Sequence, residues 1–265
     1  MGRFAGWWLV LLFCLLLHTV TEAGTIRINN RFLYPSGAVL VSTERLAQSE
    51  EQIMALTFDD GPEDRDHAIA AVLKQYDVPA SFFFIGSRLS GRTALVQQLL
   101  DAGHEVGLHG YQHRMLAWMS SASQEEDFRL GVAAMNRVGT KPHWFRPPYG
   151  SFNATTLRMA QSMGLETILW TIDPRDWTAI SAATIARRVI EQFHTGGVIL
   201  LHSHRPESLV ALPEIITAAQ AKGYRFVTLS QWRQIVVAAN CRIEKQHCPS
   251  LPEPEEIKSP TTLVH

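Results

Sequence analysis

Carboxylates and imidazoles, which can act together in acid–base or metal chemistry, gather at a few points of this sequence. Asp59 and Asp60 are adjacent, and adjacent carboxylates repel each other unless a cation or a proton relieves them. His109 and His113 are four residues apart, so that on a helical turn both imidazoles face one side and can bind one metal ion. Together with Asp60 they predict a His-His-Asp site with positions left open for water, as in catalytic metal centres.

Three further segments carry groups of the same kind. Arg146 begins Arg-Pro-Pro-Tyr-Gly and could hold a carboxylate ionised. Asp176 lies in Asp-Pro-Arg-Asp-Trp, and His202 ends an apolar run, where it would suit a general acid whose pKa an acidic neighbour raises. Each segment alone has a plain structural interpretation as a turn, a surface helix or a rigid connector.

The elements that would position these groups alternate along the chain. Strand-like apolar runs lie at residues 53–58, 80–85, 105–108, 144–145, 167–171, 198–201 and 225–228. Helical patterns lie at 66–76, 93–102, 123–138, 155–163, 184–194 and 212–222. This alternation predicts an α/β fold, a distorted (β/α) barrel of about seven parallel strands with outer helices. In such a barrel the loops after the strands carry the reactive groups, which is where these segments fall.

Composition excludes some classes of protein. Lys and Arg total 24 and Asp and Glu total 25, so the formal net charge is −1, which argues against a nucleic-acid partner. Hydrophobic residues make up 46% and charged residues 18%, enough apolar material for a core and too little charge for a disordered chain.

The ends of the chain differ from its middle. Arg3, an apolar run at residues 7–17 and small residues before Gly24 predict a signal peptide over 1–23, with an uncleaved anchor as the alternative. We therefore expect export to the periplasm or the medium, with no stable membrane span after cleavage. Residues 24–248 would form the domain, and 249–265, rich in Pro and Glu, a disordered tail. Cys241 and Cys248 could form a bridge or remain free.

The five segments, in this order, resemble the polysaccharide deacetylase family, also called the NodB homology domain or carbohydrate esterase family 4. The resemblance covers about residues 53–230 and is most specific at Thr-Phe-Asp-Asp-Gly-Pro (57–62) and Arg-Pro-Pro-Tyr-Gly (146–150). It implies a metal-dependent hydrolase that removes acetyl groups from N-acetylglucosamine units of peptidoglycan, a chitooligosaccharide or an exopolysaccharide. The alternatives are an O-acetyl esterase on xylan or another glycan, and a non-catalytic glycan-binding protein.

The resemblance also implies a role for each matching residue. One divalent metal ion, preferably zinc, with cobalt, nickel or manganese also compatible, would be bound by Asp60, His109 and His113. The general base would be Asp59, supported by Arg146, and the general acid would be His202, tuned by Asp176. The backbone N–H of Tyr149 would stabilise the oxyanion, and Trp177 would help to line the pocket.

Four other positions bear on the site. The family usually has Ser or Thr where this chain has Gly110, so we expect a hydrogen bond that braces the loop to be missing. His204 has no counterpart in the family pattern, and we expect it to face solvent rather than the pocket. Trp118 could stack on a sugar ring or be an ordinary surface aromatic. Asn153 begins a glycosylation sequon, which we interpret as a helix cap.

Overall fold

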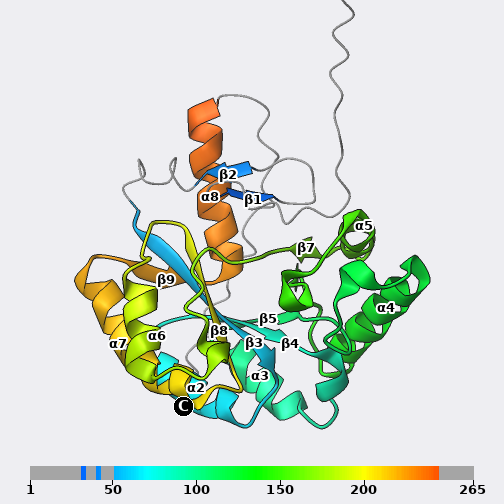
Figure 1. The fold of residues 1–265 in the computed structure, drawn as a ribbon, viewed down its shortest axis with the longest axis horizontal. Coiled ribbons are helices and arrows are strands. Elements are labelled where there is room, and N and C mark those ends of the chain that lie inside the picture. The colour runs from blue at the N-terminus through cyan, green and yellow to red at the C-terminus, as the bar shows by residue number, and fades with distance from the viewer. Residues whose placement is uncertain (1–30, 34–39, 43–50, 245–265) are drawn as a thin grey trace, which may run out of the picture.

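The structure is a computed structural model that describes residues 31–33, 40–42 and 51–244 (Figure 1). The expected signal peptide at 1–23, the expected tail at 249–265 and Cys248 lie outside these residues, and the side chain of Cys241 is not described either. Within the described part, no helix is long and apolar enough to cross a membrane.

Seven parallel strands form the main sheet, in the order β7-β6-β5-β4-β3-β8, with β9 also paired to β3. The strands are β3 (Ile53–Gly61), β4 (Ser81–Phe84), β5 (Glu105–Leu108), β6 (Trp144–Phe145), β7 (Glu166–Thr167), β8 (Gly197–His202) and β9 (Arg225–Val227). A separate antiparallel pair, β1 (Arg31–Leu33) and β2 (Leu40–Ser42), was not predicted.

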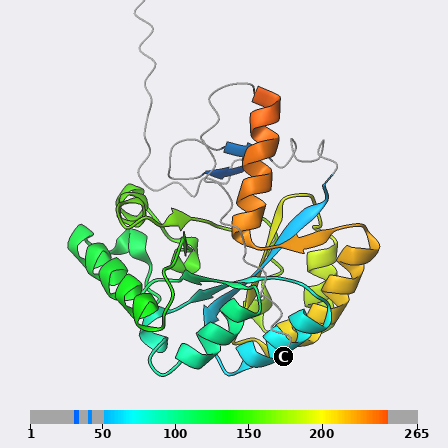
Figure 2. The same ribbon diagram turned by 180° about the vertical axis from the view of Figure 1, so that it is seen from behind.

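Helices surround the sheet on its outer side (Figures 1 and 2). They are α2 (Arg65–Gln75), α3 (Thr93–Asp101), α4 (Ser121–Arg137), α5 (Ala154–Ser162), α6 (Ala182–Ile190) and α7 (Pro206–Ala221). A further helix, α8 (Leu229–Glu244), follows β9 and does not belong to this outer layer. The prediction began α7 at residue 212. The helix begins six residues earlier because Pro206 has the fixed backbone angle and the missing N–H that suit a first helical position.

The sheet curls until its ends meet at one irregular joint. β7 ends at Thr167, so the predicted strand over 167–171 is wrong in extent. The chain then reaches β8, where Ile172 forms an isolated parallel bridge with Ile199 and Thr171 N donates to Val198 O at 3.0 Å. The architecture is therefore the distorted (β/α) barrel that the alternation predicted.

Successive side chains of a strand point to opposite faces, and this rule divides the core in two. In β3, Met54, Leu56 and Phe58 face the outer helices. Ile53 and Ala55 face inward and belong to an inner cluster, which comprises Ile53, Ala55, Phe83, Trp144, Ile168, Val198, Val227, Leu229, Trp232 and Val236. The last three of these come from α8, which thus packs against the inner faces of the strands.

The same alternation places polar side chains inside the barrel at its other end. Thr57 and Asp59 share the parity of Ile53 and Ala55 along β3, and both are buried. Arg146 shares the parity of Trp144 in the same way. The inner face is thus apolar where the strands begin and polar where they end.

We predict that Trp232→Ala lowers the free energy of unfolding by about 3–5 kcal/mol, because it leaves a large cavity in the inner cluster. Urea unfolding followed by circular dichroism measures this loss. Val210→Ala, an exposed position on α7, is the matched control and should change the free energy by less than about 0.5 kcal/mol. Equal effects of the two substitutions would show that α8 contributes little to the core.

Candidate active site

The carboxyl-terminal ends of four strands bring the predicted site residues together. The register of β3 with β8 pairs Asp59 with His202. His109 N donates to Phe84 O at 2.8 Å, and Arg146 N donates to Leu108 O at 2.9 Å, so both residues continue the strand ladder. Seven of the nine predicted positions are linked by contacts within 4 Å or by direct strand pairing, namely Asp59, Asp60, His109, His113, Arg146, Asp176 and His202.

Asp60, His109 and His113 form a cluster that could hold a metal ion. One ligand atom from each lies within 4.8 Å of the others. The Oδ1 atom of Asp60 is 2.9 Å from His113 Nε2 and 3.5 Å from His109 Nε2, yet it is buried without a hydrogen-bond partner of acceptable geometry. Asp60 and His113 both have positive φ, 70° and 55°, a sparsely populated conformation for residues other than glycine.

The hydrogen bonding of His109 suits a metal ligand. Its Nδ1 atom lies 2.7 Å from the carbonyl oxygen of Arg146. Because a carbonyl can only accept, Nδ1 carries the proton and Nε2 is left with a lone pair toward Asp60. Two imidazole nitrogens and one carboxylate oxygen fit a first-row divalent cation.

The carboxylate of Asp60 remains charged despite its burial. Burial alone raises its pKa, but the imidazoles of His109, His113 and His204 outweigh this effect and hold the pKa well below its usual range. A carboxylate with a lowered pKa between two imidazoles is the electrostatic setting that suits a bound cation.

Asp127 braces the loop between the two histidines. Its Oδ1 accepts from Tyr111 N at 2.8 Å and its Oδ2 from Gln112 N at 3.3 Å, and the side chain is buried on α4. Gly110 has φ 68°, and a Cβ atom there would lie 3.2 Å from Asp127 Oδ1. Gly110 itself offers no side chain to brace the loop, as expected, and the carboxylate of Asp127 on α4 braces it instead.

Asp59 is held by a guanidinium that is itself fully buried. Arg146 Nη1 donates to Asp59 Oδ1 at 2.8 Å and to Thr57 Oγ1 at 2.7 Å, while Nη2 donates to Leu169 O at 3.0 Å. The other oxygen of Asp59 lies 3.7 Å from His109 Nε2, at the edge of the metal cluster. Asp59 thus has one oxygen fixed by Arg146 and the other directed toward the His-His-Asp cluster.

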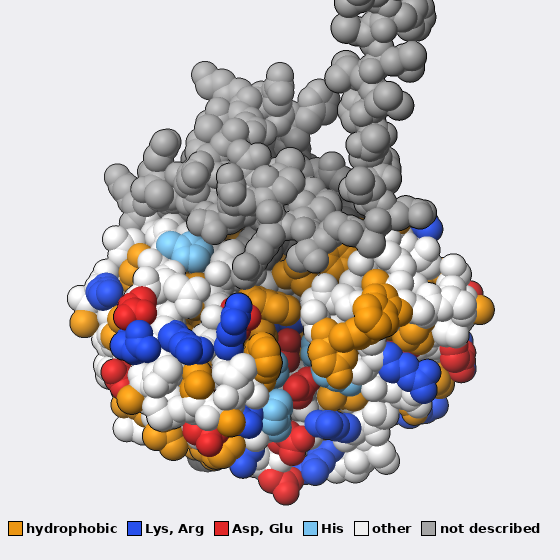
Figure 3. Space-filling model, in the orientation of Figure 1, with side chains coloured by type: hydrophobic (Ala, Val, Ile, Leu, Met, Phe, Trp, Pro, Cys, Tyr) orange, Lys and Arg blue, Asp and Glu red, His pale blue; other side chains and the backbone are white. Residues whose placement is uncertain are grey.

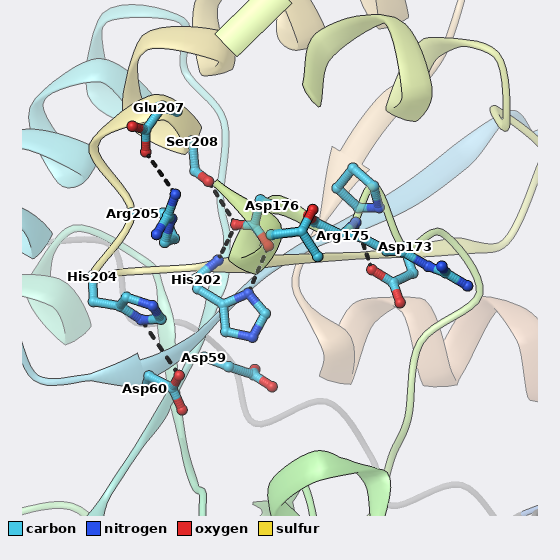
Figure 4. A network of polar contacts seen from close by, with 12 residues as sticks. Asp59, Asp60, Asp173, Arg175, Asp176, His202, His204, Arg205, Glu207 and Ser208 are labelled. Atoms are coloured by element: carbon cyan, nitrogen blue, oxygen red, sulfur yellow. Dashed lines mark hydrogen bonds and ion pairs between the residues drawn. The ribbon is translucent and has the colours of Figure 1, made fainter. Parts of the chain in front are cut away.

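His202 is oriented by Asp176, as Figure 4 shows. Asp176 Oδ1 accepts from His202 Nδ1 at 2.7 Å, and Oδ2 accepts from His202 N at 2.8 Å and from Ser208 Oγ at 2.6 Å. Burial lowers the pKa of His202, but Asp176 and the charges of Asp59 and Asp60 raise it to about 9. The imidazole is therefore protonated at neutral pH and has its Nε2–H free of Asp176.

Tyr149, Trp177 and His204 are the partly exposed members of the site. The Tyr149 ring lies 4.5 Å from the His113 ring, and Trp177 directly follows the buried Asp176. The His204 side chain is 39% exposed, but its Nδ1 atom lies 3.4 Å from Asp60 Oδ2 (Figure 4). His204 therefore contacts a predicted metal ligand as well as solvent, contrary to the expectation that it faces solvent alone.

Comparison with known proteins identifies the family. Residues 46–168 match the family described as polysaccharide deacetylase. Over 189 residues, 69% of the chain, the protein is 35% identical to a peptidoglycan-N-acetylglucosamine deacetylase of Bacillus cereus, 89% of which is covered. The solved structure of the peptidoglycan deacetylase PdaC from Bacillus subtilis superposes with a TM-score of 0.68 at 32% identity, covering 73% of this chain and 95% of that one.

A further relative has a different substrate in its name. A bifunctional xylanase/xylan deacetylase of Cellvibrio japonicus is 35% identical over 173 residues, which are 64% of this chain and 26% of that longer protein. The match to the family and the similarity to the B. cereus relative show that the chain belongs to the polysaccharide deacetylase family, as the resemblance of its motifs predicted.

We predict that Asp127→Ala weakens zinc binding by about 10–100-fold, because the loop between the two histidine ligands loses its anchor. Asp127→Asn keeps one oxygen acceptor and should lose less. Competition with a chromogenic chelator measures the affinity. Glu126→Gln, an exposed change on the same helix, is the control. An unchanged affinity in Asp127→Ala would refute the bracing role.

Proposed function

We propose that the protein is a metal-dependent hydrolase that removes acetyl groups from N-acetylglucosamine units of a glycan. The observation that carries this proposal is that three chemically different groups lie together at one end of the barrel. They are the His-His-Asp cluster, the buried carboxylate of Asp59 and the protonated imidazole of His202. Hydrolysis of an amide requires electrophilic activation, a base for water and an acid for the amine.

Asp60, His109 and His113 would hold the metal ion, and the donor set favours zinc while also accommodating cobalt, nickel or manganese. When bound, the ion supplies Lewis-acid activation to the acyl carbonyl and to water. Asp59 then accepts the proton of the attacking water through the oxygen that Arg146 does not engage. Arg146 holds this carboxylate in a fixed orientation through a charge-assisted hydrogen bond.

The breakdown step needs a proton donor, because an amide nitrogen departs readily only as a neutral amine. His202 donates through Nε2, while Asp176 holds Nδ1 and stabilises the imidazolium. The backbone N–H of Tyr149 contributes to stabilising the oxyanion, and Trp177 forms part of the pocket wall. The products are a free amino sugar and acetate.

The substrate class follows from the relatives and from the charge balance. Two of the most similar proteins are named as peptidoglycan deacetylases, and the net charge of −1 suits a weakly charged polymer bound by stacking and hydrogen bonds. Peptidoglycan is the first candidate, with chitooligosaccharides and exopolysaccharides next. Export directed by residues 1–23 would place the enzyme in the periplasm or the medium, where such polymers are reached.

O-acetyl esterase activity on xylan is the second candidate, supported by the relative from Cellvibrio japonicus. An ester releases an alcohol, which depends less on protonation than an amine does. The strong pairing of His202 with Asp176 therefore favours the amide substrate. A non-catalytic glycan-binding role would not require a buried acid, base and metal cluster to be kept together.

We predict that Asp59→Asn and His202→Ala each lower kcat for acetate release from chitohexaose by at least about 100-fold, because each removes one proton-transfer group. Circular dichroism and zinc content should remain those of the wild type. Acetylxylan, assayed in parallel, separates the two candidate activities, since faster acetate release from it would favour the esterase. Activity retained by either variant would contradict the assigned roles.

The pH profile provides a separate prediction. A general acid works only while protonated, so wild-type kcat/KM should fall as pH rises through the pKa of His202, about 9. Asp176→Asn removes the interaction that raises this pKa, and burial then lowers it toward or below its ordinary value near 6.5. The alkaline limb should move to lower pH by about two units. Ser208→Ala keeps the carboxylate of Asp176 and should move the alkaline limb less. If the limb does not move in Asp176→Asn, His202 is not the general acid.

A further inference from the structure

Exposed large apolar side chains are concentrated around the site. In the part of the chain that the structure describes, they are Met115, Trp118, Tyr149, Trp177 and Val210. The first four lie on loops that follow β5, β6 and β7, at the end of the barrel that carries the His-His-Asp cluster. Figure 3 shows hydrophobic side chains bordering a hollow in which acidic and histidine side chains are visible.

Trp118 is the most exposed of these side chains, yet its backbone is fixed. It ends the short 3₁₀ helix η2 (Leu116–Trp118), five residues after His113, and 85% of it is exposed. Asn153 Nδ2 donates to Ala117 O at 3.0 Å, and Gln124 Nε2 donates to Met119 O at 3.1 Å. The carbonyls on both sides of Trp118 are thus held by side chains from other elements.

These hydrogen bonds also join Trp118 to the wall that contains Tyr149. Asn153 caps α5, as predicted, through a reciprocal pair of hydrogen bonds with Thr156, and it ends the loop that carries Tyr149. Tyr149 in turn packs on the predicted metal ligand His113. One continuous wall therefore runs from the metal cluster through Tyr149 to the loop of Trp118.

We propose that Trp118 is a stacking platform for a pyranose ring of the glycan, at a subsite beyond the sugar whose acetamido group reacts. A pyranose ring has apolar C–H faces and a polar rim, which match the flat apolar face of an indole that is otherwise in water. Because the backbone of Trp118 is already ordered, binding loses little conformational entropy. This inference rests on the proposed function and adds that the enzyme binds a chain of several sugars.

The test measures kcat/KM on N-acetylglucosamine oligomers from the monomer to the hexamer, using the full-length zinc-loaded protein. The wild type should prefer longer oligomers. Trp118→Ala should lower kcat/KM for the hexamer about 10-fold, through KM, with the loss smallest for the monomer. Trp118→Phe should restore most of the loss, and Val210→Ala, an exposed apolar position on α7 rather than on the loop of Trp118, should have no effect.

Other results would overturn the inference. An equal loss at every oligomer length would make Trp118 a structural residue, and no loss at any length would exclude the platform. If the wild type deacetylates none of these oligomers, the proposed function fails for them. Calorimetry of chitohexaose with Asp59→Asn, with and without Trp118→Ala, then decides the matter, because an unchanged Kd or the absence of binding refutes the platform.

Discussion

The rest of the site depends on the hydrogen bonds that the buried guanidinium of Arg146 donates. It donates to Asp59 and Thr57 on β3 and to the carbonyls of Ile168 and Leu169 just after β7. Breaking such a buried pair by removing one partner typically costs about 3–5 kcal/mol, since the other charge is left uncompensated. Arg146 lies where the barrel is least regular, so one side chain both orients Asp59 and joins the segment after β7 to the opposite strand.

The backbone of the same residue serves the metal cluster. The carbonyl of Arg146 fixes the tautomer of His109, while its guanidinium fixes Asp59. Asp127 and Asp176 act in a similar way on the histidine loop and on His202. Asp59, His109 and His202 are thus each oriented by a buried partner, which is how a site limits reorganisation during reaction.

The sequence predicted those parts of the site that depend on strand periodicity. Asp59, Arg146 and His202 end apolar runs, and alternation along the strand is enough to place them together. Asp127, Ser208 and His204 were missed or misjudged, because their contacts join a helix or loop to a segment far away in the chain. No spacing rule encodes such a contact. Gly110 was interpreted as the loss of a brace in this loop, and no pattern in the sequence pointed to Asp127, which supplies the brace.

The fold, like the site, was predicted where local patterns determine it and missed where distant segments do. Strand β5 was predicted with its observed bounds, whereas the strand predicted for β7 was too long and α8 was not predicted. The extent of β7 depends on where the curled sheet approaches β8, and this is a property of the assembled sheet rather than of the local sequence. Likewise, α8 is stabilised by packing Trp232 into the inner cluster, which exists only after the strands have assembled.

The position of α8 has a consequence for how a polymer would reach the site. Leu229, Trp232 and Val236 fill the inner face where the strands begin, so the polar end is the mouth through which Asp59 is approached. A polymer substrate would therefore lie across this mouth rather than thread through the barrel. Because a strand that lies across a mouth needs no free terminus, such an enzyme would reach internal units of its polymer as well as terminal ones.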